Sequence, residues 1–98
     1  MAKLTTVYWR DIPAQVIAKE RRDTAKIVLT ERFAEAIDKA AMRAKMAGTD
    51  AYLEQWRREV VNCGKDLQAA ADEAAKKLEH DYDDARLETL ISNGGKDT

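Results

Sequence analysis

Apolar and polar residues alternate along the first third of the chain, which is the pattern of β-strands. The alternation predicts strands over residues 4–9, 14–19 and 25–29, and the first of them is rich in β-branched and aromatic side chains. Pro13 marks the turn between the first two strands, because its fixed φ and missing N–H suit a turn or an edge position. We therefore expect an antiparallel sheet of these strands, whose apolar face must be covered.

The spacing of apolar residues changes to that of helices after residue 30. A stripe at i, i+4, i+7, i+8 and i+11 predicts a helix over residues 31–46, with Thr30 as its N-cap and Gly48 ending it in a left-handed conformation. Thr49 is expected to cap a second, shorter helix. The large side chains of that helix are Tyr52, Leu53 and Trp56.

The second half of the chain contains a break and a long helix. Val60 and Val61, followed by a turn over 62–64, favour an extended segment and allow a short fourth strand. Asp66 is expected to cap the last and longest helix, with a break over 81–84 and a stop at 94–95. The prediction is an α+β fold in which helices cover one face of a three- to four-stranded antiparallel sheet, as a single domain over residues 1–98.

Length and charge narrow the classes of function. A chain of 98 residues buries roughly 60 to 65 % of its unfolded surface, so its core is marginal and a partner is plausible. Basic and acidic side chains number 17 and 18, whereas proteins that bind duplexes or membrane surfaces usually carry a basic excess. We expect no nucleic-acid partner and no membrane association.

Cysteine usage and apolar runs point to the cytoplasm. One cysteine cannot form an internal disulfide, and the pattern of a signal peptide is not present. No apolar run approaches the roughly 20 residues that span a bilayer.

Catalytic chemistry is sparse in this sequence. The single histidine, His80, would face Asp83 and Asp84 on a helix, a spacing that suits either a metal or proton-transfer site or a solvated acidic face; we favour the solvated face. Cys63 precedes the last helix and is read as an incidental small residue rather than a reactive thiol. We therefore predict no catalytic residues, no metal and no cofactor, and we favour a protein without catalytic activity of its own.

Aromatic and basic residues cluster at two places. Such clusters serve as core, as protein-binding hot spots or as platforms for nucleotides, and their roles stay open at this point. The candidate partner-binding residues are Tyr8, Trp9, Arg10, Tyr52, Trp56 and Arg57.

Seven segments of the chain have an unusual order and spacing of residues: Tyr8–Val16, Glu31–Phe33, Ala36–Asp38, Ala40–Met42, Thr49–Leu53, Trp56–Arg57 and Tyr82–Leu87. In this order and spacing they resemble the conserved virulence factor family of small bacterial proteins. The resemblance implies an accessory role without catalytic residues to carry over. It also implies that stand-alone members are encoded near folate and corrinoid one-carbon enzymes, including methylenetetrahydrofolate reductase.

Two functions from different classes follow. The first is a small, non-enzymatic partner subunit of a larger folate- or corrinoid-dependent enzyme, of the methylenetetrahydrofolate reductase or methyltransferase type. The alternative is a small-molecule or nucleotide binding module, which needs a concave pocket where Arg10, Arg57 or His80 converge. A homo-oligomer formed through the alanine-rich last helix is a further option.

Overall fold

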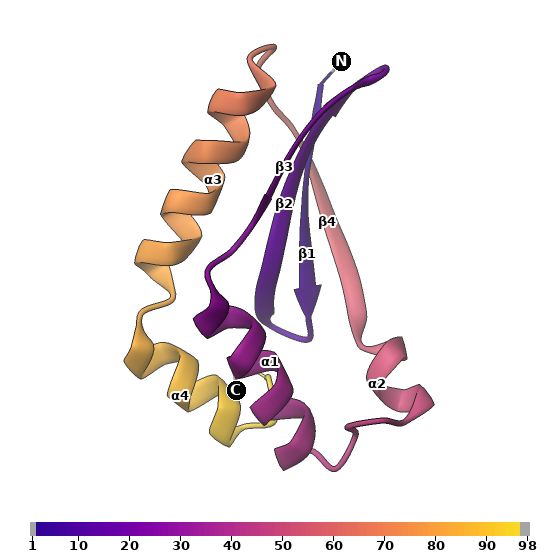
Figure 1. The fold of residues 1–98 in the computed structure, drawn as a ribbon, viewed down its shortest axis with the longest axis vertical. Helices are drawn as coiled ribbons and strands as arrows, with labels where there is room; N and C mark the ends of the chain where they lie inside the picture. Colours follow the sequence, from indigo (N-terminus) through magenta and orange to yellow (C-terminus); the bar gives the residue numbers. More distant parts are fainter. Residues whose placement is uncertain (1, 97–98) are drawn as a thin grey trace.

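A computed structural model describes residues 2–96 as one antiparallel sheet accompanied by helices (Figure 1). The elements in chain order are β1 (Lys3–Trp9), β2 (Ile12–Glu20), β3 (Asp23–Val28), α1 (Glu31–Arg43), α2 (Asp50–Glu54), β4 (Trp56–Asn62), α3 (Leu67–Asp81) and α4 (Asp84–Ser92). The strands lie in the order β3-β2-β1-β4, and every neighbouring pair is antiparallel. The predicted α+β class is confirmed, and the fourth strand is longer than the segment around Val60 and Val61 that suggested it.

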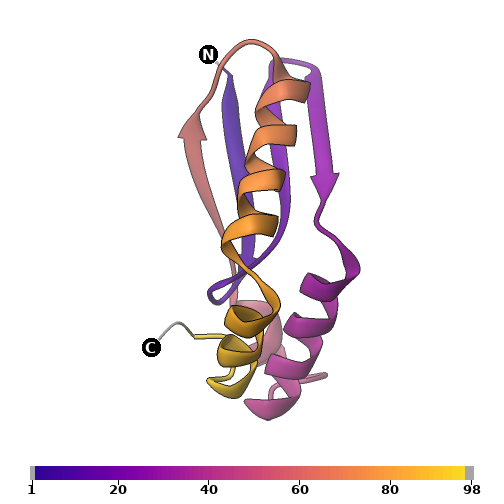
Figure 2. The ribbon, with the colours of Figure 1, turned by 90° about the vertical axis from the view of Figure 1, so that its left-hand side faces the viewer.

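Helix α3 covers one face of the sheet by packing on β2 and β3, as Figure 2 shows. The side chains between them are mostly small: Ala18 and Ala25 from the strands and Ala71 and Ala75 from the helix are all buried. Small side chains allow helix and sheet to approach closely. The alanine residues of α3 therefore pack against the sheet of the same chain. Helix α1 packs against α4 and the end of β2.

In the part of the chain that the structure describes, the opposite side of the sheet carries no helix along most of its length, and we call it the open face. Side chains alternate between faces along each strand, so the pairing registers fix its membership. Trp9 and its pairing partner Ile12 also point to this side but are fully buried. The other residues of the open face are Lys3, Thr5, Val7, Gln15, Ile17, Lys19, Thr24, Lys26, Val28, Trp56, Arg58, Val60 and Asn62.

The first hairpin turns earlier than the sequence suggested. Arg10, with φ +54°, and Asp11 form the turn, and Pro13 lies inside β2, buried and opposite Tyr8. The prediction of a turn at Pro13 was wrong because the register shifts between Val7 and Tyr8, making a bulge in which the missing N–H of a proline is tolerated.

The ends of α1 also differ from the prediction. The helix stops at Arg43, and Lys45, with φ +59°, takes the left-handed position that Gly48 was expected to fill. The N–H groups of Lys45 and Met46 donate to the carbonyls of Met42 and Ala41, which closes the helix. Thr30 precedes the helix but makes no side-chain cap, because its hydroxyl donates to Glu79 instead.

The remaining boundaries mostly follow the sequence. Thr49, Asp66 and Asp83 accept backbone N–H groups as N-caps of α2, α3 and α4, and the predicted break between the last two helices is confirmed. The expected second helix ends before Trp56, however, which is the first residue of β4. Pairing with β1, opposite Trp9, outweighs helix propensity at this position.

Gly94 and Gly95 end α4 as predicted, and Gly95 has a second role in packing. The N–H of Gly95 donates to the carbonyl of Leu90 at 2.7 Å, and its φ is +95°. A Cβ on this residue would lie 2.7 Å from Cζ3 of Trp9. Only glycine therefore lets the end of α4 lie against the indole.

We expect Gly95→Ala to lower the free energy of unfolding by about 2 to 4 kcal/mol, through left-handed strain and overpacking against Trp9. Urea unfolding followed by circular dichroism measures the loss. Gly64→Ala is the matched control, since no atom lies within 4 Å of its added Cβ, and it should change stability by about 1 kcal/mol at most. Equal losses in the two variants would contradict this account.

Candidate functional site

The six candidate partner-binding residues do not form one surface. Trp9 is completely buried, and its indole Nε1 donates to the backbone carbonyl of Tyr52 at 2.9 Å. Its ring lies 5.5 Å from that of Tyr52, centroid to centroid. Trp9 thus joins β1 to α2 in the core, where it is not accessible to a partner.

Arg10 is held by three groups of the chain. Its guanidinium donates to Oε1 of Gln55 at 3.2 Å, to the carbonyl of Gly94 at 2.9 Å and to Sδ of Met46 at 3.1 Å. These contacts tie the β1–β2 turn to the segments that follow α1, α2 and α4. The guanidinium of Arg10 therefore has a structural role, since it connects these segments of the fold.

Tyr8 and Arg57 lie together on the covered side of the sheet. The Arg57 guanidinium is 4.4 Å from the Tyr8 ring centroid and pairs with the carboxylates of Asp11, at 3.2 Å, and Glu59. Burial, followed by the nearby Tyr82 and Glu59, raises the pKa of the Tyr8 hydroxyl. Tyr8 is therefore a neutral phenol at physiological pH, and Arg57 is paired within the chain.

Tyr52 and Trp56 lie on the other side, where they border the open face. Their rings meet edge to face, with centroids 6.1 Å apart. Trp56 is 37 % exposed. Burial, together with the charge of Asp38, raises the pKa of the Tyr52 hydroxyl.

An apolar groove of about 250 Å³ runs between this aromatic pair, the open face and α1. Its lining residues are Val7, Ala14, Gln15, Val28, Leu29, Ala34, Ile37, Asp38, Tyr52 and Trp56. A second depression, lined by Val7, Gln15, Trp56, Arg57 and Arg58, continues from it. Arg58 and Val28 border this surface, and the sequence analysis did not select them. The face that each takes depends on pairing, of β4 with β1 for Arg58 and of β3 with β2 for Val28, which the local sequence does not give.

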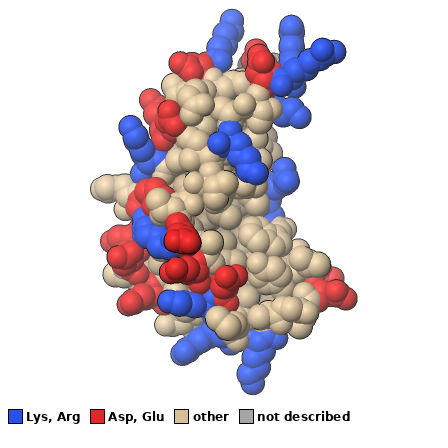
Figure 3. All heavy atoms as spheres, in the orientation of Figure 1, with Lys and Arg blue, Asp and Glu red and all other residues tan. Residues whose placement is uncertain are grey.

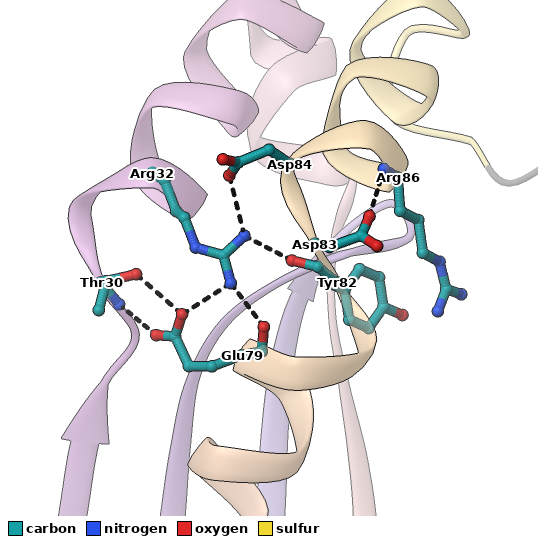
Figure 4. A network of polar contacts seen from close by, with 7 residues as sticks. All are labelled: Thr30, Arg32, Glu79, Tyr82, Asp83, Asp84 and Arg86. Carbon is teal, nitrogen blue, oxygen red and sulfur yellow. Dashed lines mark hydrogen bonds and ion pairs between the residues drawn. The ribbon is translucent and has the colours of Figure 1, made fainter.

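A polar network joins the start of α1 to the junction of α3 and α4 (Figure 4). Arg32 donates to the Glu79 carboxylate at 2.9 Å and to the Glu79 carbonyl at 2.6 Å, and it pairs with Asp84 at 3.4 Å. Thr30 donates to the same Glu79 carboxylate through its N–H and its hydroxyl, at 2.8 and 2.9 Å. Each of these side chains is bonded to another part of the chain. We therefore interpret the network as a structural connection between the start of α1 and the junction of α3 and α4.

The candidate chemical groups remain apart from one another. His80 is 90 % exposed at the end of α3, with Nδ1 3.5 Å from Asp81. Within residues 2–96, no group of three or more histidine, cysteine or acidic side chains could hold a metal ion. Arg10 and Arg57 share one open depression with Lys96, and His80 is not among its lining residues. In the same described range, no helix is long and apolar enough to cross a bilayer.

The fold and this surface define a class: a small α+β protein with a four-stranded antiparallel sheet, one face covered by a helix and the other open. A family model described as "Virulence factor" matches residues 7–91. The chain belongs to the virulence factor family. No curated protein and no solved structure matches it.

Because Trp9 is fully buried, we expect Trp9→Ala to cost about 3 to 5 kcal/mol of folding stability. Chemical denaturation of the purified variant measures the loss. Trp56→Ala provides the comparison, since this indole is partly in water and should cost clearly less. A Trp9→Ala variant as stable as the wild type would refute the core assignment.

The network at Glu79 predicts a pH dependence of stability. Burial alone would raise the pKa of Glu79, but the hydrogen bonds from Thr30 and Arg32 and the charge of Arg32 lower it overall. A lowered pKa in the folded state stabilises the fold above the ordinary glutamate pKa, and this contribution is lost as the pH falls through the folded value.

We therefore expect Glu79→Gln to cost about 1 kcal/mol at neutral pH, with the difference from wild type vanishing in acid. Thermal unfolding between pH 3 and pH 7 follows this difference. Glu73→Gln, at an exposed position of the same helix, should track the wild type. A Glu79→Gln deficit that persists undiminished in acid would exclude the charge as its cause.

Proposed function

We propose that the chain is a non-enzymatic accessory protein that binds a larger protein partner through the open face and the adjoining strand β4. The observation that carries this proposal is apolar surface left in water: Val28 is 66 % exposed, Val60 55 % and Trp56 37 %. All three belong to the open face. Val28 and Trp56 line the same groove, and apolar side chains left in water around a groove are a common sign of a binding site.

Strand β4 adds a second way of contacting a partner. All seven of its residues are exposed, and among residues 2–96 only one of its edges is paired, with β1. The unpaired backbone groups of an edge strand can extend the sheet into another chain. The proposed contact surface therefore keeps Tyr52 and Trp56 from the sequence-based candidates, with Arg57 at its border, whereas Tyr8 lies on the covered side.

The partner class that we propose is a folate- or corrinoid-dependent one-carbon enzyme, of the methylenetetrahydrofolate reductase or methyltransferase type. Support for this class comes from the family resemblance, which implies such enzymes as genetic neighbours. In this proposal the enzyme carries the cofactor and the catalytic residues, and the present chain is its small subunit.

A small-molecule binding module remains the second candidate, and the groove beside Trp56 is the observation in its favour. Its volume of about 250 Å³ lies just below the usual range of ligand sites, and one end opens to solvent along β4. Arg10 is already committed to Gln55 and Gly94, so it is poorly placed to receive an anion.

Two neighbouring valines of β4 provide a test of the accessory role. Val60 lies on the open face and Val61 on the covered side, and their exposures are similar, at 55 and 58 %. The tagged chain is purified under mild conditions from its native cell, and one-carbon enzymes in the eluate are quantified by mass spectrometry. We expect stoichiometric recovery of such an enzyme with wild type and Val61→Asn, and at least a tenfold loss with Val60→Asn.

Light scattering and circular dichroism on each variant verify size and folding. Recovery of the chain alone from wild-type preparations would overturn the proposed partner. Equal recovery with both variants would overturn the assignment of the open face as the contact surface.

A further inference from the structure

Charge is sorted between the two faces of the sheet. The strands contain three carboxylates, Glu20, Asp23 and Glu59, and alternation places all three on the covered side. The basic residues of the open face are Lys3, Lys19, Lys26 and Arg58. The chain carries a formal net charge of −1, yet the side chains of its open face contribute only positive charge.

Most of these cations are available to a ligand. Lys3 donates to the side chain of Asn62 at 2.7 Å, which is a neutral partner. Lys19, Lys26 and Arg58 are exposed, and none of them forms an ion pair within residues 2–96. A surface of like charges produces a positive potential that attracts an acidic partner and speeds its association.

The cations adjoin the apolar groove. Arg58 borders the depression that continues from the groove past Val7, Gln15 and Trp56. Asp38 of α1 also lines the groove. In Figure 3 a broad area of uncharged atoms lies on the lower right of the molecule, beside α2. The surface thus offers an apolar slot with a cation next to it.

We infer that the open face binds an extended acidic segment of the partner, which places an apolar side chain in the groove and carboxylates beside Arg58, Lys26 and Lys19. This inference rests on the proposed accessory function and adds the chemistry of the partner to it. Arginine suits carboxylates because its planar guanidinium can donate two parallel hydrogen bonds to them.

A single-stranded nucleic acid fits this face less well. Nucleic-acid platforms of this kind stack bases on aromatic side chains of the sheet. The central strands present Thr5, Val7, Gln15 and Ile17 on the open face, and none of these residues is aromatic. Trp9 points to the same side but is fully buried, so it offers no stacking surface. Trp56 lies at the edge strand, and its ring is already engaged by Tyr52.

A second copy of the chain is also disfavoured as the occupant. Two open faces brought together would oppose four cations with four cations, and the facing surfaces would contribute no carboxylates from their strands. Like charges across an interface cost several kcal/mol. An acidic segment neutralises the same charges.

The first experiment uses a defined probe, a random copolymer of glutamate and tyrosine, added to the ¹⁵N-labelled chain in low salt. We expect amide shifts at open-face residues and an affinity that falls as salt is added. The double variant Lys26→Glu/Arg58→Glu should weaken binding by about tenfold or more. The matched control is Lys76→Glu/Lys77→Glu on α3, which should stay within about twofold of wild type because these lysines lie on another element.

Several results would overturn the inference. These are shifts confined to the covered side, no binding of the glutamate–tyrosine copolymer, equal binding of a lysine–tyrosine copolymer, or tighter binding of oligo(dT) than of the acidic probe. The co-purification assay separates this inference from the proposed function. Loss of the partner with Val60→Asn but not with Lys26→Glu/Arg58→Glu rejects the acidic segment alone, whereas retention of the partner in both variants rejects the open face as the contact surface altogether.

Discussion

The buried indole of Trp9 is the contact on which the rest of the structure depends. Its Nε1–H satisfies the carbonyl of Tyr52 on α2, and its six-membered ring lies against the backbone of Gly95 after α4. One side chain thereby connects the first strand to segments more than forty and eighty residues away. In a chain of 98 residues, where most of the other buried side chains are alanine or aliphatic, such a large buried ring is a major single contribution to apolar burial.

The open face follows from the width of the sheet relative to its single covering helix. Helix α3 packs on β2 and β3, and the helices of the other end gather around Trp9 and Phe33. This arrangement leaves β4 and the outer side of the sheet in water. The residues that carry the family resemblance mostly connect elements of the fold and are not part of this surface. Arg32 bridges to Glu79, and the rings of Phe33 and Tyr82 lie 6.2 Å apart. The sequence pattern of the family is therefore more directly related to the fold than to an activity.

Local patterns in the sequence predicted the elements well, because capping and alternation act over a few residues. Asp66, Asp83 and the glycine pair after α4 behave as their types predict. Positions governed by distant contacts were predicted less well. The residues around Trp56 predict a helix at this position. Trp56 instead begins strand β4, because it pairs with β1.

The site illustrates the same limit. Trp9 and Trp56 have similar sequence surroundings, an aromatic or a polar residue before and an arginine after, but only the first is buried. Arg57 and Arg58 are adjacent, and the pleat places them on opposite faces. The confinement of the strand carboxylates to the covered side depends on the register of four strands, which no single segment encodes. The open face could therefore be recognised only after the strands were paired.

The position of β4 at the edge of the sheet has a consequence for how the molecule moves. β1, β2 and β3 follow one another through short turns, whereas β4 pairs with β1 across a separation of 47 residues at Trp9 and Trp56 (56 − 9). Exposed strands joined by distant contacts belong to the least protected parts of a fold and open without global unfolding. Such local opening would expose the amides of β4 to hydrogen exchange, and a bound segment would suppress it. The ordering of this strand is thus coupled to whatever occupies the surface beside it.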